Sequence, residues 1–346
     1  MSAEALRSAL RELAHGGSLT ADAAAAAFGD VMRGEGTPAT VAALLAALRV
    51  KGETPDEVAG AARALREAMT VFDAPNPEGL VDTCGTGGGT VTTFNISTAA
   101  ALVAAGAGVR IAKHGNRSFT SRSGSADVLE ALGIPLDVPV ARMADILAHA
   151  GIVFMFAPAM HPAMKHVGPV RRELAIPTVM NLVGPLANPA RAGRQVVGVA
   201  DPARLDLIAG ALAALHTRRA LIVHGAPGLD EVSPLGITRV IEVRGAERRE
   251  WTIDPHTAGF APVAASELTG GDPAENAAMI TEILSGGGSA GARSAVLLNA
   301  AAAILVSGEQ DDFAGALQTA RDALARGAGL TTLERLRAAV RAALGQ

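Results

Sequence analysis

Hydrophobic residues in the first 72 positions recur at the spacing of α-helices. Leu6, Leu10 and Leu13 fall on one face of a first helix. Three further helices are each expected to begin at a threonine that can cap them, over residues 20–32, 37–48 and 54–69. Two prolines in the segment 73–77 then mark a boundary or hinge. The pattern therefore predicts a small all-helical N-terminal domain over residues 1–72.

Beyond Leu80 the pattern changes to short apolar runs that alternate with helical stretches. The candidate strands are 80–84, 109–112, 152–156, 195–198, 220–223 and 240–243. Such alternation is typical of a mostly parallel sheet with helices on both faces. Prolines interrupt short helical pieces at residues 162–189, and helices at 293–306 and 311–344 are expected to cover the sheet. The predicted fold class is α/β: a small all-helical N-terminal domain plus a large domain, residues 78–161 and 190–346, with a mostly parallel central sheet flanked by helices.

A glycine-rich turn follows the first candidate strand. Four glycines lie within five residues, at positions 85, 87, 88 and 89, where they allow positive φ and bring backbone N–H groups close to a ligand. Asn95, Ser97 and Thr98 then open an alanine-rich helix, whose free N–H groups and dipole favour an anion. Strand, turn and helix start together predict a phosphate site. The alternative is a tight strand-to-helix turn in which the glycines serve only geometry.

A second polar segment follows the next candidate strand. It reads Lys113-His114-Gly115-Asn116-Arg117, and small hydroxyl residues come after it. In open α/β sheets, ligands bind beyond the carboxyl ends of the strands. Two neighbouring strands would therefore carry phosphate-binding groups at one edge: backbone amides from the first, a cation and hydroxyls from the second. Taken alone, this segment is more typical of a solvated surface turn, but the two loops together favour a phosphate site.

Two adjacent carboxylates, Asp230 and Glu231, follow the candidate strand 220–223 at the same expected edge. Mg²⁺ prefers oxygen ligands and usually binds through one or two carboxylates plus substrate phosphates. The pair is therefore a candidate magnesium site. The alternatives are a solvated pair on a loop and, for Asp230, the N-cap of a helix.

Composition and charge exclude several classes of protein. The net charge of −4 provides no broad basic field, so no nucleic-acid partner is expected, although a local basic groove is not excluded. The longest apolar stretches, 96–109 and 295–306, are shorter than a bilayer span, and the charged N-terminus has no apolar signal core. We therefore expect no membrane partner and a cytoplasmic location. The single cysteine, Cys84, excludes a disulfide framework within the chain and fits a reducing compartment.

Several motifs together carry a family resemblance. They are GTGG-x(5)-FNIST from Gly85, KHGNR-x(3)-S-x-SGSADVLEALG from Lys113, HPAMK at 161–165, GPVRRELAIPTVMNLVGPLANP at 168–189 and HGAPGLDEVSP at 224–234. In order and spacing, over nearly the whole chain, they resemble the anthranilate phosphoribosyltransferases and, more distantly, the pyrimidine nucleoside phosphorylases that share their fold. One position departs from the family, because Gly89 stands where its loop usually carries an aspartate.

The resemblance implies sites for two substrates and a metal. The positions implied for phosphoribosyl diphosphate are Gly85, Gly88, Gly89, Thr93, Asn95, Ile96, Ser97, Thr98, Lys113, His114, Gly115, Asn116, Arg117, Ser118, Phe119, Thr120, Ser121 and Ser125. Those implied for anthranilate are Gly85, His114, Asn116, His161, Arg171, Gly184 and Pro185, with Arg171 at the substrate carboxylate. We expect its neighbour Arg172 to face solvent or Glu173. Those implied for the metal are Ser97, Asp230 and Glu231, which would hold Mg²⁺, expected as two ions.

The implied reaction is attack by the amine of anthranilate on C1′ of phosphoribosyl diphosphate, with release of pyrophosphate. An aniline-type amine is unprotonated at neutral pH, so orientation and electrostatics can supply most of the catalysis and no catalytic nucleophile is expected. The resemblance also implies a homodimer through the helical domain, against which the 162–189 insert would pack. The rival interpretations are a related phosphoribosyltransferase or phosphorylase with a different acceptor, and a non-catalytic relative that binds nucleic acid.

Overall fold

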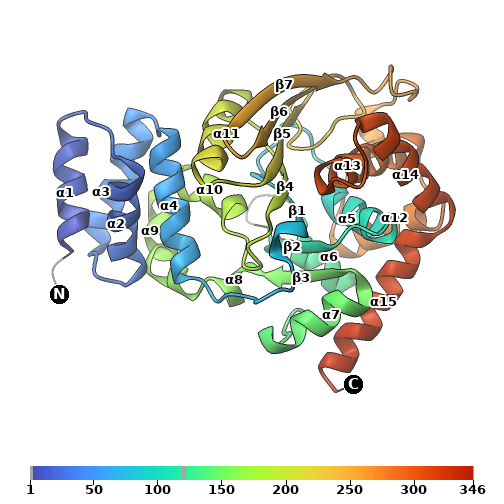
Figure 1. Ribbon diagram of the computed structural model, residues 1–346, viewed down its shortest axis with the longest axis horizontal. Helices are drawn as coiled ribbons and strands as arrows, with labels where there is room; N and C mark the ends of the chain where they lie inside the picture. Colours follow the sequence, from blue (N-terminus) through green and yellow to red (C-terminus); the bar gives the residue numbers. More distant parts are fainter. Residues whose placement is uncertain (1–2, 119–121, 346) are drawn as a thin grey trace.

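Four helices form a bundle at the N-terminal end of the chain (Figure 1). They are α1 (Glu4–Ala14), α2 (Ala21–Met32), α3 (Pro38–Lys51) and α4 (Pro55–Ala68) in the computed structural model, which describes residues 3–118 and 122–345. The three predicted caps are confirmed, because the hydroxyls of Thr20, Thr37 and Thr54 accept hydrogen bonds from backbone N–H groups three residues further on. Each cap satisfies an N–H group that the start of a helix leaves without an intrahelical partner.

A seven-stranded mixed sheet forms the centre of the molecule. Its strands are β1 (Val81–Gly85), β2 (Ile111–Gly115), β3 (Ile152–Phe156), β4 (Arg194–Gly198), β5 (Arg219–Gly225), β6 (Thr238–Arg244) and β7 (Glu247–Ile253). The order across the sheet is β3-β2-β1-β4-β5-β6-β7, with parallel pairing from β3 to β5 and antiparallel pairing of β5 with β6 and of β6 with β7. The predicted fold class, with a mostly parallel sheet, is confirmed.

Strand β7 was not among the strands expected from the sequence. This edge strand begins with four charged residues, so the apolar run that indicates a buried strand is lacking. Charges on an edge strand hinder pairing with another chain, which explains why such a polar segment closes the sheet. The other six strands lie where they were expected, with ends shifted by up to three residues.

Helices and short connecting turns surround the sheet. In the region after β1 they are α5 (Ile96–Gly106), α6 (Ser125–Ala131), α7 (Met143–Ala150), α8 (Ala157–Met160), η3 (Pro162–His166), α9 (Gly168–Leu174), α10 (Met180–Val183) and η4 (Gly184–Leu186). Those after β4 are α11 (Leu205–Ala214), α12 (Pro273–Leu284), α13 (Ala290–Ser307), α14 (Phe313–Ala325) and α15 (Ala328–Ala343). The remaining 3-10 turns are η1 (Pro77–Gly79), η2 (Val140–Arg142), η5 (Pro202–Arg204) and η6 (Ala265–Leu268).

The two faces of the sheet belong to two hydrophobic clusters. Along β5, Leu221 and Val223 point into the cluster that contains α5 and α13, whereas Ala220 and Ile222 point into the cluster that contains the bundle and α11. This alternation is the two-residue period of a strand with both faces buried. The bundle therefore shares one core with the second face of the sheet.

The proline-rich insert contributes to the same core as the bundle. Val167, Val170 and Val179 are buried in that cluster, and Arg66 of α4 donates a 2.6 Å hydrogen bond to the backbone oxygen of Leu186. These contacts fix the insert between bundle and sheet. The division of the chain into domains at residues 72 and 78 stays a prediction.

Helix α13 lies in the core between the sheet and the outer helices (Figure 1). Over the described ranges it is the one helix long and apolar enough to cross a membrane, and 83% of it is buried inside the structure. It contacts β1, β4 and β5 on one side and α5 and α14 on the other. The core helix of a folded domain can have this length and apolar composition, so the burial of α13 accounts for its hydropathy.

Candidate active site

The glycine turn after β1 lies against the acidic loop after β5. The backbone N–H of Gly87 donates a 2.8 Å hydrogen bond to Oδ2 of Asp230, and the N–H of Thr90 donates a 3.1 Å bond to the oxygen of Gly228. Gly87 and Gly88 have φ of 69° and 80°, in the left-handed region that favours glycine. The turn itself is exposed. Its remaining N–H groups are therefore accessible to an anion.

Close packing around Asp230 explains two glycines that end neighbouring strands. A Cβ at Gly85 would lie 2.5 Å from Oδ2 of Asp230, and a Cβ at Gly198 would lie 1.7 Å from its backbone oxygen. Both strand ends must therefore lack side chains for the acidic loop to fit. The interpretation of Asp230 as an N-cap is wrong, because the residues after it form bends and then β6.

The carboxylates of Asp230 and Glu231 interact in a partly buried site. Burial and the charge of Asp230 raise the pKa of Glu231 to about 8, while Lys113 and the backbone N–H of Ser97 act in the opposite direction. Burial also raises the pKa of Asp230, and the hydrogen bond from Gly87 opposes that shift. Two carboxylates whose mutual repulsion raises a pKa are relieved by a bound cation. The donor set therefore fits Mg²⁺, with two carboxylates and the hydroxyl of Ser97.

The ammonium group of Lys113 is buried between β1 and the start of α5. Its Nζ donates to the backbone oxygen and the hydroxyl of Thr83, the latter at 3.2 Å, and to the hydroxyl of Ser97, also at 3.2 Å. These three bonds use the three donors of an ammonium group. Burial lowers the pKa of Lys113, and the nearby charge of Asp82 opposes this shift. Lys113 therefore orders the strand ends in this structure, and it contributes positive charge from below the site.

The start of α5 faces the acidic loop and the loop after β2. Asn95 does not cap α5 through its side chain; its amide nitrogen donates to the oxygen of Ser123 at 3.1 Å, and its oxygen accepts from Asn276 of α12 at 3.0 Å. Ile96 and Thr98 are buried, and their N–H groups donate to the backbone oxygens of Phe94 and Asn95. The N–H of Ser97 bonds to the carboxylate of Glu231, so the anion at this helix start is a carboxylate of the acidic loop. Asn95 ties three segments together.

Asp127 organises the loop that follows β2. Its carboxylate accepts hydrogen bonds from the backbone N–H groups of Ser118 and Gly124 and pairs with Arg117 at 2.9 Å. Arg117 also pairs with Glu130 of α6, which directs its guanidinium to this helix. The positions Phe119, Thr120 and Ser121 lie outside the described residues.

The remaining predicted positions of this loop lie together at its base. The oxygen of Asn116 accepts from the hydroxyl of Ser125 at 3.4 Å, and a Cβ at Gly115 would meet that hydroxyl at 2.2 Å. The side-chain oxygen of Asn116 accepts from the N–H of Arg117. Thr93, just before the start of α5, is partly exposed. The loop base and the glycine turn therefore follow adjacent strands, as expected from the parallel order.

Two buried histidines meet where the insert joins the sheet. The Nε2 atoms of His114 and His161 lie 3.2 Å apart, and the backbone of Gly184 faces His114. The backbone oxygen of Pro185 accepts a 2.9 Å hydrogen bond from Gln195. The structure thus brings together four of the positions expected around anthranilate. It also excludes a solvated turn at His114, which is only 8% exposed.

Lowering the pH from 6.5 to 4.5 is expected to destabilise the fold through this pair. Burial lowers the pKa of His114 to about 3 and that of His161 to about 4, and His161 also lowers the pKa of His114. Below about pH 6.5 these two histidines become protonated in the unfolded chain, whereas they stay neutral in the folded protein. The free energy of unfolding should therefore fall by up to about 1.4 kcal/mol per pH unit for each histidine. Urea unfolding at pH 6.5, 5.5 and 4.5 measures this slope.

A variant isolates the contribution of the pair from that of other titrating groups. His161→Gln should flatten the pH dependence of the free energy of unfolding, whereas His256→Gln, at an exposed histidine, should leave it unchanged. Equal slopes for His161→Gln and the unaltered protein would contradict the neutral, buried state of the pair.

Arg171 and Arg172 occupy different environments on α9. Arg171 is partly buried, and this burial lowers the pKa of its guanidinium. Within the described ranges no carboxylate lies in ion-pair distance of Arg171, so its charge has no counterion from these residues. Arg172 is exposed, as expected. The structure places α9 against α3 and η3, one short helix beyond His161.

Two buried polar residues that were not predicted from the sequence link the insert to the sheet. Asp82 of β1 accepts a 3.1 Å bond from the N–H of His114 and a 2.7 Å bond from the amide of Asn188. Asn188 also donates to the oxygen of Ala112 at 2.8 Å. A charged residue inside an apolar strand run was the available signal for Asp82, because such a group must find partners when buried.

Family comparisons identify the class of protein that this fold and site define. The α/β domain of the glycosyl transferase family matches residues 77–330, and the helical bundle domain of that family matches residues 7–69. Together they cover most of the chain and correspond to the sheet with its helices and to the N-terminal bundle. The chain is thus a glycosyl transferase of the type that joins a helical bundle to an α/β domain.

Individual relatives narrow this class. Anthranilate phosphoribosyltransferase of Roseiflexus sp. (strain RS-1) is 49% identical over 334 residues, which cover 96% of this chain and 97% of the relative. The crystal structure of the enzyme of that name from Thermus thermophilus is 41% identical, with a TM-score of 0.91 over 96% of this chain and 99% of that chain. The Saccharomyces cerevisiae enzyme in complex with PRPP and Mg is 29% identical, with a TM-score of 0.88 over 97% and 98%. The chain therefore belongs to the anthranilate phosphoribosyltransferase family.

Proposed function

We propose that the chain transfers the 5-phosphoribosyl group of phosphoribosyl diphosphate to the amine of anthranilate, a step of tryptophan biosynthesis. The C1′–O bond to pyrophosphate breaks, the C1′–N bond forms, and the amine loses one proton. The observation that carries this proposal is the contact between the glycine turn and Asp230. It joins anion-binding N–H groups to cation-binding carboxylates at one edge of the sheet, as a metal-bound diphosphate requires.

The chain's own groups would hold the donor substrate by backbone and charge. The exposed N–H groups of the glycine turn suit phosphate oxygens. The hydroxyls and amides at the base of the loop after β2 are available for further contacts to the donor. The predicted donor positions stay our proposal, with Lys113 acting through its buried charge and Arg117 by ordering the loop through α6.

Magnesium would be held by Asp230, Glu231 and the hydroxyl of Ser97. When bound, it supplies positive charge that neutralises the leaving pyrophosphate. The raised pKa of Glu231 supports a cation at this position, and the yeast relative has been solved with PRPP and Mg. Two ions per site belong to the proposal.

The acceptor would lie between the insert and the loop after β2. Arg171 has a guanidinium without a counterion among the described residues, which suits the carboxylate of anthranilate through two parallel hydrogen bonds. Asn116 would orient the amine, and the neutral histidines with Gly184 and Pro185 would line the ring. The yeast relative has also been solved in complex with 4-fluoroanthranilate, which supports an acceptor of this class.

A direct assay tests the function. Protein, Mg²⁺, phosphoribosyl diphosphate and anthranilate are mixed, and the loss of anthranilate fluorescence is followed together with the release of pyrophosphate. Equal rates of both signals are expected. Pyrophosphate release with other amines but not with anthranilate would favour a transferase with a different acceptor. Consumption of a nucleoside with free phosphate would favour a phosphorylase.

A homodimer through the bundle and a cytoplasmic location are further parts of the proposal.

Gly89→Asp restores the carboxylate that the family usually carries and is expected to tighten apparent binding of phosphoribosyl diphosphate. The φ of Gly89 lies outside the left-handed region, and a Cβ there would lie 3.0 Å from the oxygen of Gly228 and 3.5 Å from Oδ1 of Asp230. A third carboxylate near the pair would strengthen the cation site. We expect a gain of about 1 kcal/mol, a fraction of the ~4 kcal/mol that two charges reach at 4 Å with an effective dielectric constant of 20.

Titration with phosphoribosyl diphosphate at several Mg²⁺ concentrations measures the effect. Gly89→Asn has nearly the same shape without the charge, and it should bind like the unaltered protein. If Gly89→Asp and Gly89→Asn give the same curves, the glycine turn acts through its backbone amides alone. The KM for anthranilate should stay nearly constant in both variants.

A further inference from the structure

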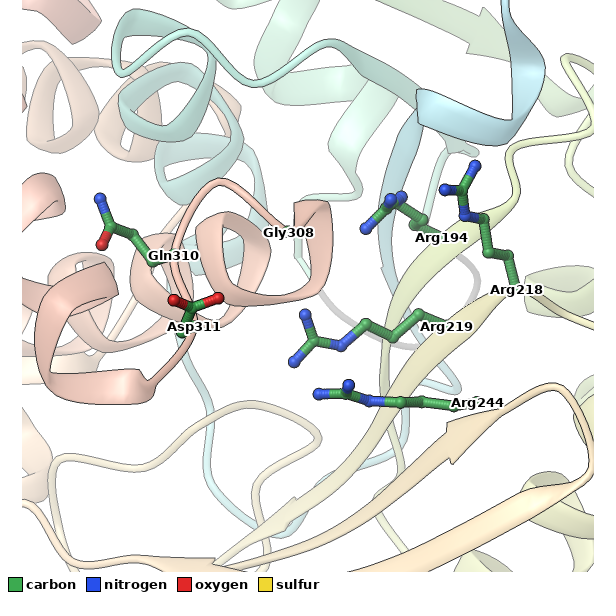
Figure 2. Close-up of a pocket in the computed structure, with 7 residues that line it drawn as sticks. All are labelled: Arg194, Arg218, Arg219, Arg244, Gly308, Gln310 and Asp311. Atoms are coloured by element: carbon green, nitrogen blue, oxygen red, sulfur yellow. The ribbon is translucent and has the colours of Figure 1, made fainter.

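Four arginines line a pocket (Figure 2). It lies where β4 and β5 begin, at the opposite edge of the sheet from the glycine turn, which follows the end of β1. Arg194 opens β4, Arg218 and Arg219 lie at the start of β5, and Arg244 ends the antiparallel β6. The pocket has a volume of about 330 Å³, and the turn after α13 closes it with Gly308, Gln310 and Asp311. A five-residue strand such as β4 spans about 16 Å, so this pocket is separate from the candidate active site.

Arg194 and Arg219 hydrogen-bond to the C-terminal end of α13. Nη1 of Arg194 donates a 2.8 Å hydrogen bond to the oxygen of Val306, and Nη1 of Arg219 donates to the oxygen of Leu305. The last carbonyls of a helix lack intrahelical donors and carry partial negative charge, so guanidinium groups stabilise them. This accounts for Arg219, which is buried, and for part of Arg194.

Arg244 and Arg218 have few hydrogen-bond acceptors near their guanidinium groups. Nε of Arg244 donates to Oε1 of Glu242 at 2.7 Å, but the same oxygen already accepts from Arg219 at 2.8 Å. Arg218 is exposed, and within the part of the chain that the structure describes its guanidinium has no hydrogen-bond or ion-pair partner. Glu242 and Asp311 lie at the pocket, and the charges of Glu78 and Glu309 act on Arg194. The carboxylates therefore equal the arginines in number, but among the described residues none of them pairs with Arg218.

We propose that this pocket binds a small phosphate-type oxyanion through the guanidinium groups of Arg194, Arg218 and Arg244. Guanidinium groups match phosphate oxygens by paired hydrogen bonds. Figure 2 shows the side chains of Arg194, Arg219 and Arg244 extending toward the turn with Gly308. The volume is at the lower end of the range for small-molecule pockets, about 300–1,000 Å³, which suits a compact ion. Burial and the charges of Arg218 and Arg219 lower the pKa of Arg194, whereas the charges of Glu309 and Glu78 act in the opposite direction. A bound anion would relieve the repulsion among the arginines.

The test is calorimetric titration of the full-length protein with inorganic phosphate and, separately, with pyrophosphate, without Mg²⁺ and at constant ionic strength. The variant is Arg218→Ala with Arg244→Ala, which leaves the buried Glu242 paired with Arg219. The charge-matched control is Arg110→Ala with Arg335→Ala, at two exposed arginines outside the pocket, the first of which precedes β2 at the same sheet edge. Thermal unfolding verifies that both variants fold.

We expect the unaltered protein and the control to bind the anion. In Arg218→Ala/Arg244→Ala the affinity should fall by roughly tenfold or more, because the loss of a charge-assisted hydrogen bond weakens binding by about this factor. The KM for phosphoribosyl diphosphate should stay the same in that variant, which separates this pocket from the active site. Tighter binding of pyrophosphate than of phosphate would identify the product of the reaction as the occupant. The reverse order would identify free phosphate or a phosphate monoester.

Two results would overturn the proposal. One is a titration of Arg218→Ala/Arg244→Ala that matches the unaltered protein for both ions. The other is that neither ion binds to the pocket, while the unaltered protein binds a single-stranded oligonucleotide and Arg218→Ala/Arg244→Ala does not. In that case the arginines would form a nucleic-acid contact, and the pocket would have no small-ion site.

Discussion

Replacing Asp230 by Asn together with Glu231 by Gln is expected to lower turnover by at least about a thousandfold and to leave the fold intact. A bound metal ion contributes several kcal/mol of charge stabilisation in the transition state, and about 4 kcal/mol corresponds to a thousandfold change in rate. The amide of Asn can still accept the hydrogen bond that Gly87 now donates to Asp230. The glycine turn should therefore keep its position.

The stability of this variant provides a separate measurement. Burial and the charge of Asp230 raise the pKa of Glu231 to about 8, so this site disfavours two ionised carboxylates, and neutral amides remove that cost. We expect an unfolding temperature equal to or above that of the unaltered protein in the absence of Mg²⁺. The control is Asp145→Asn with Glu334→Gln, at two exposed carboxylates. Near-normal turnover of the Asp230/Glu231 variant across Mg²⁺ concentrations would rule out this metal site.

Arg171→Ala is expected to raise the KM for anthranilate by roughly 10- to 150-fold and to change the KM for phosphoribosyl diphosphate much less. The loss of a hydrogen bond to a charged group costs about 1.5–3 kcal/mol. No carboxylate among the described residues pairs with Arg171, so its removal leaves none of them unpaired. Steady-state kinetics with each substrate varied in turn measures the two constants.

Two further variants sharpen this result. Arg171→Lys keeps the charge but loses the planar fork, so its KM for anthranilate should lie between those of the unaltered protein and Arg171→Ala. Arg172→Ala removes the exposed neighbour on α9 and should behave like the unaltered protein. Equal weakening of both substrates in Arg171→Ala would remove Arg171 from the anthranilate site.

Local signals allowed much of the fold to be predicted. The threonine caps at Thr20, Thr37 and Thr54 are short-range features, and the structure bears all three out. The parallel strands have apolar runs because both of their faces are buried. Strand β7 could not be found in this way, because it has only one neighbour and begins with charged residues. Its pairing depends on β6 and not on its own composition.

The site was predictable in its location but less so in its contacts. The strand ends place Gly85, Gly115 and the acidic pair at one edge, as the parallel order requires. The direction of the Lys113 side chain depends on Thr83 and Ser97, which are 30 and 16 residues away. The partner of Asp82 is Asn188, 106 residues later in the chain. Such distant pairs leave no local pattern, so only the structure reveals them.

The central position of α13 has a consequence for synthesis on the ribosome. The face of β1, β4 and β5 that this helix covers is translated well before residues 290–307. Until then the growing chain exposes an apolar sheet face, and exposed apolar surface of this kind makes folding intermediates prone to aggregate. The large domain can thus reach its native packing only when translation is nearly complete. A chain that stops before residue 307 would therefore depend on chaperones or be degraded.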